Sequence, residues 1–214
     1  MEKSVAVLGL GKYGKSLAEN LYNMGADVLA VDQDRELIND FAGKCTAAIC
    51  ANLADEDEVA SLGLKNMDIV VTAMGGNLAA SIMSVSVAKE QGVPMVIAKS
   101  SSKRMSSILL TVGADKILNP EGDEGMRSAR VILSSSIEDF FEFGENLFMI
   151  EMSPKEEWVG KNLMQLNLRK MHNLNIVAIK EKGNRWKFID VKKPLPADCS
   201  LLIVMDKKDM EKWT

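Results

Sequence analysis

The fold of this chain is decided by the stretch Ser4-Val5-Ala6-Val7-Leu8-Gly9-Leu10-Gly11-Lys12-Tyr13-Gly14. An apolar strand runs into a G-x-G-x-x-G sequence that opens a helix, and a second apolar strand then ends at Asp32. In this motif Gly9 allows the tight turn, Gly11 lets phosphate approach the backbone, and Gly14 lets the helix pack on the strand. Asp32 is placed to accept hydrogen bonds from a ribose. The motif therefore predicts an adenine-nucleotide site.

Strand and helix patterns alternate from residue 4 to about residue 134. Strands are expected at 4–8, 28–32, 47–50, 68–73, 95–98 and 116–118. Helices are expected at about 12–24, 35–42, 77–91, 103–112 and 121–134, with a short one opening at 55–58. This order predicts an α/β fold with a Rossmann-type, doubly wound, parallel six-stranded sheet.

A second, smaller α+β domain is expected after a hinge. The run Ser134-Ser135-Ser136 and the mixed segment Ile137–Gly144 interrupt the alternation, which places the domains at 1–134 and 135–214. Short strands are expected at 147–151, 176–179, 186–189 and 201–205, a helix at 160–169, a hairpin turn at 182–184, and a short helix or exposed end at 208–213.

Further candidate ligand contacts follow other strands of the expected sheet. Ala73-Met74-Gly75-Gly76-Asn77 lies at the carboxyl end of the fourth strand, where open α/β sheets bind ligands, although a plain turn with an N-cap would use the same residues. Lys99 and Lys12 are placed to reach a terminal phosphate, or are simply solvated. Asn52 follows the third strand and could contact adenine or ribose, or serve only the turn.

Acidic residues open the last helix expected in the first domain, in the segment Asn119–Glu124. Carboxylates at a helix start usually complement the helix dipole. The alternative is a divalent cation held between symmetry-related carboxylates of two subunits.

Composition excludes several classes of function. A net charge of −4 does not favour nucleic acid as a partner. No apolar run approaches the roughly 18 residues of a membrane span, so no direct membrane insertion is expected. Glu2 and Lys3 lead directly into the first strand, so no signal peptide is expected. Cys45, Cys50 and Cys199 lack C-x-x-C spacing and are expected to be buried, reduced thiols.

Catalysis is not expected. His172 is the one histidine of the sequence and lies far from the glycine motif, and no nucleophile or histidine–carboxylate metal motif is present. Tyr13 and Tyr22 are the two tyrosines, and neither is placed as a proton donor in a substrate pocket. An oxidoreductase that uses NAD(H) remains the enzymatic alternative.

Six segments of the sequence carry a family resemblance, and they are 5–14, 30–32, Ser61-Leu62-Gly63, Gly113–Glu121, Asn175–Ile179 and Leu201–Met205. With these segments the chain resembles the regulatory subunit of Trk/Ktr-type bacterial potassium transporters, built from an RCK (KTN) N-terminal domain and an RCK C-terminal (TrkA-C) domain. The resemblance covers the whole chain. The Gly-Ala-Asp…Pro-Glu segment at 113–121 is more telling than the glycine motif, which many enzymes share.

The resemblance implies a cytoplasmic protein at the inner face of the membrane. Such subunits form a homodimer through the last Rossmann helix and the C-terminal domains, and dimers assemble to an octameric ring beneath a membrane subunit that conducts potassium. Bound nucleotide changes the shape of the ring, with ATP generally activating and ADP inactivating in the Ktr type, and some Trk-type members bind NAD(H). An RCK regulator of another cation channel or antiporter would suit the same sequence.

The resemblance also implies site residues. The nucleotide site is expected to include Gly9, Gly11, Lys12, Tyr13, Gly14, Asp32, Asn52, Ala73, Gly75, Asn77 and Lys99. Lys12 stands where Ktr members often have an arginine, and it keeps the charge without the planar fork. Ala51-Asn52-Leu53-Ala54 replaces the usual Gly-Asp-Ala-Thr.

Two further ligands are implied. Glu121 matches a glutamate that holds a divalent cation, Mg²⁺ or Ca²⁺, at the subunit interface of Ktr-like members. Several Ktr members bind cyclic di-AMP in the C-terminal domain, and Arg169, Asn175 and Pro194 fall near the matching places.

Overall fold

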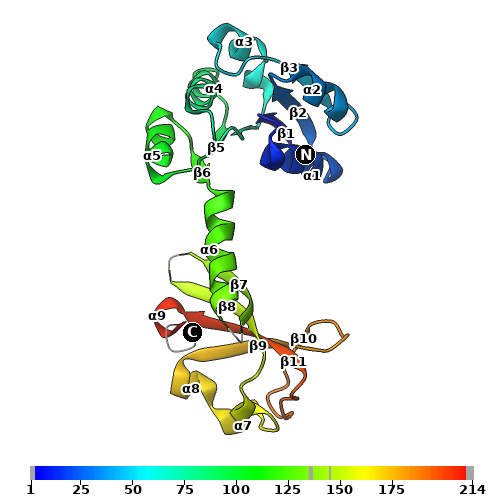
Figure 1. Cartoon of the computed structure of the whole chain (residues 1–214), viewed down its shortest axis with the longest axis vertical. Helices are drawn as coiled ribbons and strands as arrows, with labels where there is room; N and C mark the ends of the chain where they lie inside the picture. Colours follow the sequence, from blue (N-terminus) through cyan, green and yellow to red (C-terminus); the bar gives the residue numbers. More distant parts are fainter. Residues whose placement is uncertain (1–2, 135–136, 145, 211–214) are drawn as a thin grey trace. The chain divides into compact units, whose positions relative to one another are not determined.

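The chain forms two compact units, Met1–Gly122 and Asp123–Thr214, in a computed structural model that describes residues 3–134, 137–144 and 146–210 (Figure 1). Helix α6 (Pro120–Leu133) contains the point of division. Most of α6, from Asp123 onward, therefore belongs to the second unit. The domain boundary at residue 134 stays a prediction.

The first unit contains a parallel sheet with the strand order β3-β2-β1-β4-β5-β6, which is the Rossmann order. Its strands are β1 (Ser4–Leu8), β2 (Asp27–Asp32), β3 (Ala47–Cys50), β4 (Ile69–Thr72), β5 (Met95–Lys99) and β6 (Lys116–Leu118). Every pairing between them is parallel. The expected six-stranded sheet is confirmed.

Helices cover both faces of this sheet (Figure 1). They are α1 (Lys12–Asn23), α2 (Arg35–Phe41), α3 (Glu56–Ser61), the 3-10 turn η1 (Leu64–Asn66), α4 (Leu78–Glu90) and α5 (Lys103–Val112). Residues of α1 and α2 pack on one face, and residues of α3, α4 and α5 pack on the other. Because central parallel strands are buried on both faces, β1 and β4 are almost wholly apolar, as SVAVL and IVVT.

The second unit is built on an antiparallel sheet with the order β10-β9-β11-β8-β7. Its strands are β7 (Ile137–Phe143), β8 (Leu147–Met152), β9 (Leu174–Glu181), β10 (Lys187–Phe188) and β11 (Cys199–Asp206). Its short helices are η2 (Glu156–Trp158), α7 (Leu163–Leu166), α8 (Leu168–His172) and α9 (Lys207–Met210). Alternate residues of β8 and β11, with Trp158 and Leu168, form a separate core.

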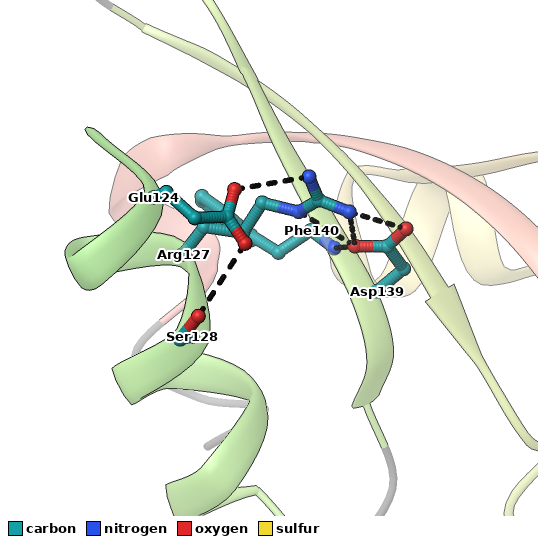
Figure 2. A network of polar contacts seen from close by, with 5 residues as sticks. All are labelled: Glu124, Arg127, Ser128, Asp139 and Phe140. Atoms are coloured by element: carbon teal, nitrogen blue, oxygen red, sulfur yellow. Dashed lines mark hydrogen bonds and ion pairs between the residues drawn. The ribbon is translucent and has the colours of Figure 1, made fainter. Parts of the chain in front are cut away.

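Helix α6 is bonded to strand β7 by an arginine (Figure 2). Arg127 Nε donates to Asp139 Oδ1 at 2.9 Å, and its Nη2 donates to Asp139 Oδ2 at 2.9 Å. Glu124 Oε2 accepts from Nη1 of the same guanidinium at 3.3 Å. This two-pronged geometry fixes the helix against the strand in direction as well as in distance.

The structure corrects three expectations in detail. Ile137–Phe143 forms strand β7 rather than a mixed hinge segment, while residues 135 and 136 of the expected hinge lie outside the described residues. The helix expected at 160–169 is two short helices, because Asn167 between them adopts a left-handed conformation, with φ 47°. Cys50 is exposed, whereas Cys45 and Cys199 are buried.

In the described part of the chain, no helix is both long enough and apolar enough to span a membrane.

Candidate nucleotide site

The glycine turn between β1 and α1 has the backbone geometry that its sequence predicts. Gly9 has φ +99°, and a Cβ there would lie 2.5 Å from Met74 Cγ. A Cβ on Gly14 would lie 1.9 Å from the carbonyl oxygen of Gly9 and 3.2 Å from Ala73 Cβ. These two positions can therefore hold only glycine without movement of the backbone. The turn brings α1 close to the ends of β1 and β4.

Asp32 ties the glycine turn to the end of β2. Its Oδ2 accepts the backbone N–H of Leu10 at 2.6 Å, and its Oδ1 accepts the N–H of Asp34 at 3.0 Å. A carboxylate has further lone pairs that can accept from a ribose hydroxyl. Asp32 thus fixes the position of the turn and still presents a hydrogen-bond acceptor at the carboxyl ends of the strands.

The N-terminus of α1 is open for an anion. Gly11 is its N-cap and has no side chain to cap it, and a Cβ at Gly11 would meet nothing within 4 Å. The N-caps of α2, α3, α4 and α5 each accept a backbone N–H with their own side chains, those of Asp34, Asp55, Asn77 and Ser102. Free N–H groups beside open space fit a phosphate.

A pocket of about 120 Å³ adjoins Asp32. It is lined by Asp32, Gln33, Leu53, Met74, Asn77 and Ala80. The structure therefore brings together Asp32 and Asn77, which the sequence named. Met74 belongs to the turn after β4 that the sequence also proposed as a ligand contact. Gln33, Leu53 and Ala80 were missed, although Gln33 and Leu53 follow carboxyl strand ends that the sequence had located.

A second cluster of predicted residues surrounds the ammonium group of Lys99, at the end of β5. Lys99 Nζ lies 2.6 Å from Glu121 Oε1, 5.9 Å from the centroid of the Tyr13 ring and 2.9 Å from the place where a Cβ on Gly75 would be. The ammonium thus lies between the first glycine turn, the turn after β4 and the start of α6. One ammonium group therefore lies near three segments that are distant in sequence.

These neighbours change two protonation equilibria. The hydrogen bond from Lys99 lowers the pKa of Glu121, against the opposing effect of partial burial. Burial, and then the negative charge of Glu121, raises the pKa of Tyr13. At neutral pH Glu121 is therefore a carboxylate, and the Tyr13 side chain is a neutral phenol.

The remaining predicted residues occupy ordinary positions. Lys12 is exposed in the first turn of α1, and Ala73 is buried directly after β4. Asn52 Oδ1 accepts the N–H of Ala54 at 3.1 Å, which is a local turn contact, and Asn52 does not line the pocket beside Asp32. The assignment of all eleven residues to a nucleotide stays a prediction.

Glu121 alone is not a cation site. Among the described residues no group of three or more His, Cys, Asp or Glu side chains could hold a metal ion. Mg²⁺ and Ca²⁺ take several oxygen ligands, and one carboxylate bonded to an ammonium does not supply them. The donor set of a single chain therefore does not fit the predicted cation, whose site would need a second subunit.

The second unit contains a pocket of about 260 Å³ near α8 and the start of β9. Arg169 and Asn175 line it, together with apolar side chains that include Leu163 and Ile176. Pro194 is not among the lining residues, whereas Val191 is. Two of the three residues suggested for cyclic di-AMP thus share one pocket.

This arrangement defines a class of protein, a Rossmann-type unit with an open glycine turn joined to a small antiparallel α+β unit. The TrkA-N domain family matches the chain over residues 5–120. The chain is 31% identical to Ktr system potassium uptake protein A of Bacillus subtilis (strain 168), over 99% of this chain and 95% of that protein. It is 34% identical to Ktr system potassium uptake protein A of Vibrio alginolyticus, over 97% and 94%. The chain therefore belongs to the TrkA-N domain family and is a homologue of these Ktr system potassium uptake proteins.

Solved structures share the fold. The RCK domain of GsuK has a TM-score of 0.68 at 14% identity, over 99% of this chain and 46% of that one. The GsuK channel bound to NAD has a TM-score of 0.67 at 14% identity, over 98% and 38%. GsuK bound to ADP has a TM-score of 0.51 at 10% identity, over 61% and 34%. The chain thus spans less than half of each of these longer chains.

Proposed function

We propose that this chain is a cytoplasmic, nucleotide-sensing regulatory subunit that gates a membrane potassium transporter of the Trk/Ktr type. The open N-terminus of α1 is the observation that carries this proposal, together with the bond between Asp32 and Leu10 and the Lys99 ammonium 5.9 Å from the Tyr13 ring of the first turn. Near-complete coverage of the Ktr potassium uptake proteins supports it.

The proposed ligand is ATP or ADP, with NAD(H) as the alternative. The free N–H groups of α1 and the Lys99 ammonium would hold phosphates, and Asp32 would accept from the ribose. GsuK structures with NAD and with ADP are consistent with either ligand, and they support it by fold alone. Ligand binding can shift an equilibrium between two subunit arrangements only by its differential affinity for them.

The proposed assembly is a homodimer that forms an octameric ring beneath the membrane subunit. Exposed apolar side chains on α6, those of Met126, Ile132 and Leu133, would supply the dimer contact. Symmetry would also place the Glu121 carboxylates of two subunits where they could share Mg²⁺ or Ca²⁺. A cation at this place would stabilise the assembly and supply no chemical step.

We propose that the protein is not an enzyme. The groups around the pocket bind and orient, and none is placed as a proton donor to a substrate. If the protein is instead an oxidoreductase, incubation with NADH and carbonyl acceptors will consume NADH, measured by absorbance. We expect no consumption.

Thermal shift tests the proposal. ATP, ADP, NAD and NADH are added to the full chain in turn, and a ligand at a hundredfold excess over Kd stabilises the native state by about 2.7 kcal/mol. Asp32→Ala should abolish the shift because it removes both the ribose acceptor and the bond to Leu10. Asp27→Ala, at the opposite and exposed end of β2, is the matched control and should keep the shift.

The identity of the transporter needs a separate test. A Trk/Ktr-type membrane subunit that co-purifies with the chain, and releases it or changes conductance when ATP is exchanged for ADP, would support the main proposal. Co-purification with an antiporter or a different cation channel would support the alternative regulator. Absence of any nucleotide-induced shift would overturn the nucleotide-sensing role.

A further inference from the structure

The ion pair between Lys99 and Glu121 is unequal in its exposure to solvent. The Lys99 side chain is 11% exposed, and the Glu121 side chain is 65% exposed. A mostly buried ammonium needs a negative partner, because losing its hydration without one is costly. An exposed carboxylate that leaves such a pair regains water at little cost. The pair can therefore exchange its anion much more easily than its cation.

The Lys99 ammonium also faces the place where a ligand phosphate would lie. It is next to Gly75 in the turn after β4 and near the Tyr13 ring in the first turn of α1. Gly75 leaves no Cβ between the ammonium and this turn, since one would approach Nζ to 2.9 Å. The cation that a phosphate would use is thus already bonded to a carboxylate of the same chain.

We propose that Glu121 is an internal competitor of the ligand, whose carboxylate occupies Lys99 until a nucleotide phosphate displaces it. This inference rests on the proposed nucleotide function and adds the residue that sets its specificity. A ligand with enough negative charge at its phosphate end replaces Glu121 on Lys99. Adenosine has no phosphate and leaves the pair intact.

The displaced residue lies where a change can be transmitted. Glu121 is in the first turn of α6, and Arg127, in a later turn of the same helix, is bonded to Asp139 of β7. Exchange of the anion on Lys99 therefore releases the start of the helix whose later turns are held by the second unit. The bound phosphate would thus act in two ways, by contacting Lys99 and by breaking the ion pair between Lys99 and Glu121.

Calorimetric titration of the full chain in EDTA tests the inference, because EDTA removes any divalent cation that would involve Glu121. Adenosine, ADP and ATP are titrated into the natural protein, Glu121→Gln and Glu124→Gln. Glu121→Gln should bind ADP and ATP about fivefold more tightly, as expected for removal of a partly exposed ion pair, and adenosine without change. Glu124→Gln, at an exposed acid three residues further along α6, should leave all affinities unchanged.

The same substitution of Glu121, made in a protein that lacks the Lys99 ammonium, tests whether the gain in affinity depends on Lys99. In Lys99→Met, which lacks the ammonium, Glu121→Gln should no longer change the affinity for ADP or ATP. Unchanged or weaker ADP and ATP binding by Glu121→Gln, an equal gain for adenosine, or a gain that persists in Lys99→Met would overturn the inference while nucleotide binding stands. If neither the natural protein nor any variant binds the three ligands, the nucleotide function is overturned together with the inference.

Discussion

Gly11 and Gly14 are three residues apart in one turn and have opposite reasons to be glycine. A Cβ on Gly14 would collide with the carbonyl oxygen of Gly9, whereas a Cβ on Gly11 would enter open space. Glycine at position 14 is required by the folded chain itself. Glycine at position 11 would be required by a bound ligand.

Alanine at each position should separate these roles. Gly14→Ala should lower the free energy of unfolding by about 2 kcal/mol or more, because the backbone must move to admit the methyl group. Gly11→Ala should leave the unfolding midpoint almost unchanged, since φ there is −61°, and should weaken binding of ADP. Denaturant unfolding and calorimetry measure the two effects. Equal stability loss in both variants would contradict this assignment.

Asp115 is a carboxylate whose role in stability depends on pH. Its Oδ2 accepts the N–H of Val96 at 2.7 Å, and Lys89 Nζ lies 3.1 Å from each oxygen. The backbone hydrogen bond, and then Lys89, lowers the pKa of Asp115, against the effect of partial burial. The bonds join the end of α4 and the start of β5 to the turn before β6.

A folded-state pKa below the unfolded value stabilises the protein above the unfolded pKa, and this stabilisation is lost as pH falls through the folded pKa. Asp115→Asn should therefore cost about 1 kcal/mol at neutral pH, the contribution of a typical hydrogen bond to a charged group on a partly exposed site. The cost should begin to shrink below roughly pH 4, where the carboxyl of the unfolded chain becomes protonated, and should be smallest once pH has fallen through the lowered folded pKa. Unfolding midpoints at neutral and acidic pH measure this difference, and a cost that is independent of pH would contradict it.

At the scale of elements, strand β7 shows why part of the fold escaped sequence analysis. The segment reads IEDFFEF, and its pairing with β8 shifts register between Ile137 and Asp139. This irregularity breaks the alternation of buried and exposed residues that reveals a half-buried strand. The strands of the first unit were found because nearly continuous apolar runs do not depend on alternation.

Helix α6 and β7 give a prediction at the same scale. Arg127→Lys should lower the melting temperature of the second unit, because an ammonium cannot make the two parallel bonds to Asp139 or stack on the Phe141 ring, whose centroid is 4.7 Å from the guanidinium carbon. Arg185→Lys makes the same substitution at an exposed position of the same unit and should leave the melting temperature unchanged. Equal melting temperatures for the two variants would show that the bidentate pair contributes nothing.

At the scale of the whole molecule, the two pockets lie in different units, so their ligands should be separable by mutation. Asp32→Ala should abolish the thermal shift caused by ADP and keep any shift caused by cyclic di-AMP. Arg169→Ala should do the reverse, because its side chain lines the pocket of the second unit and Asp32 lines that of the first. Loss of both shifts in either single variant would contradict two independent sites.

The candidate site was predictable from the sequence to different degrees. Gly9, Gly14 and Asp32 belong to one local motif, and their geometry follows from it. The contact between Lys99 and Glu121 depends on how β5 and α6 meet in three dimensions, and no local pattern contains it. Sequence alone therefore located the strand ends that form the site and could not say which side chains face one another.

The thiol of Cys50 gives the protein a built-in position for a reporter group. Cys50 ends β3 and pairs in register with Asp32, while the other two thiols are buried. A maleimide fluorophore should therefore label the folded chain at one place, beside the pocket, without any engineered cysteine. Emission from that label would follow ligand occupancy in real time.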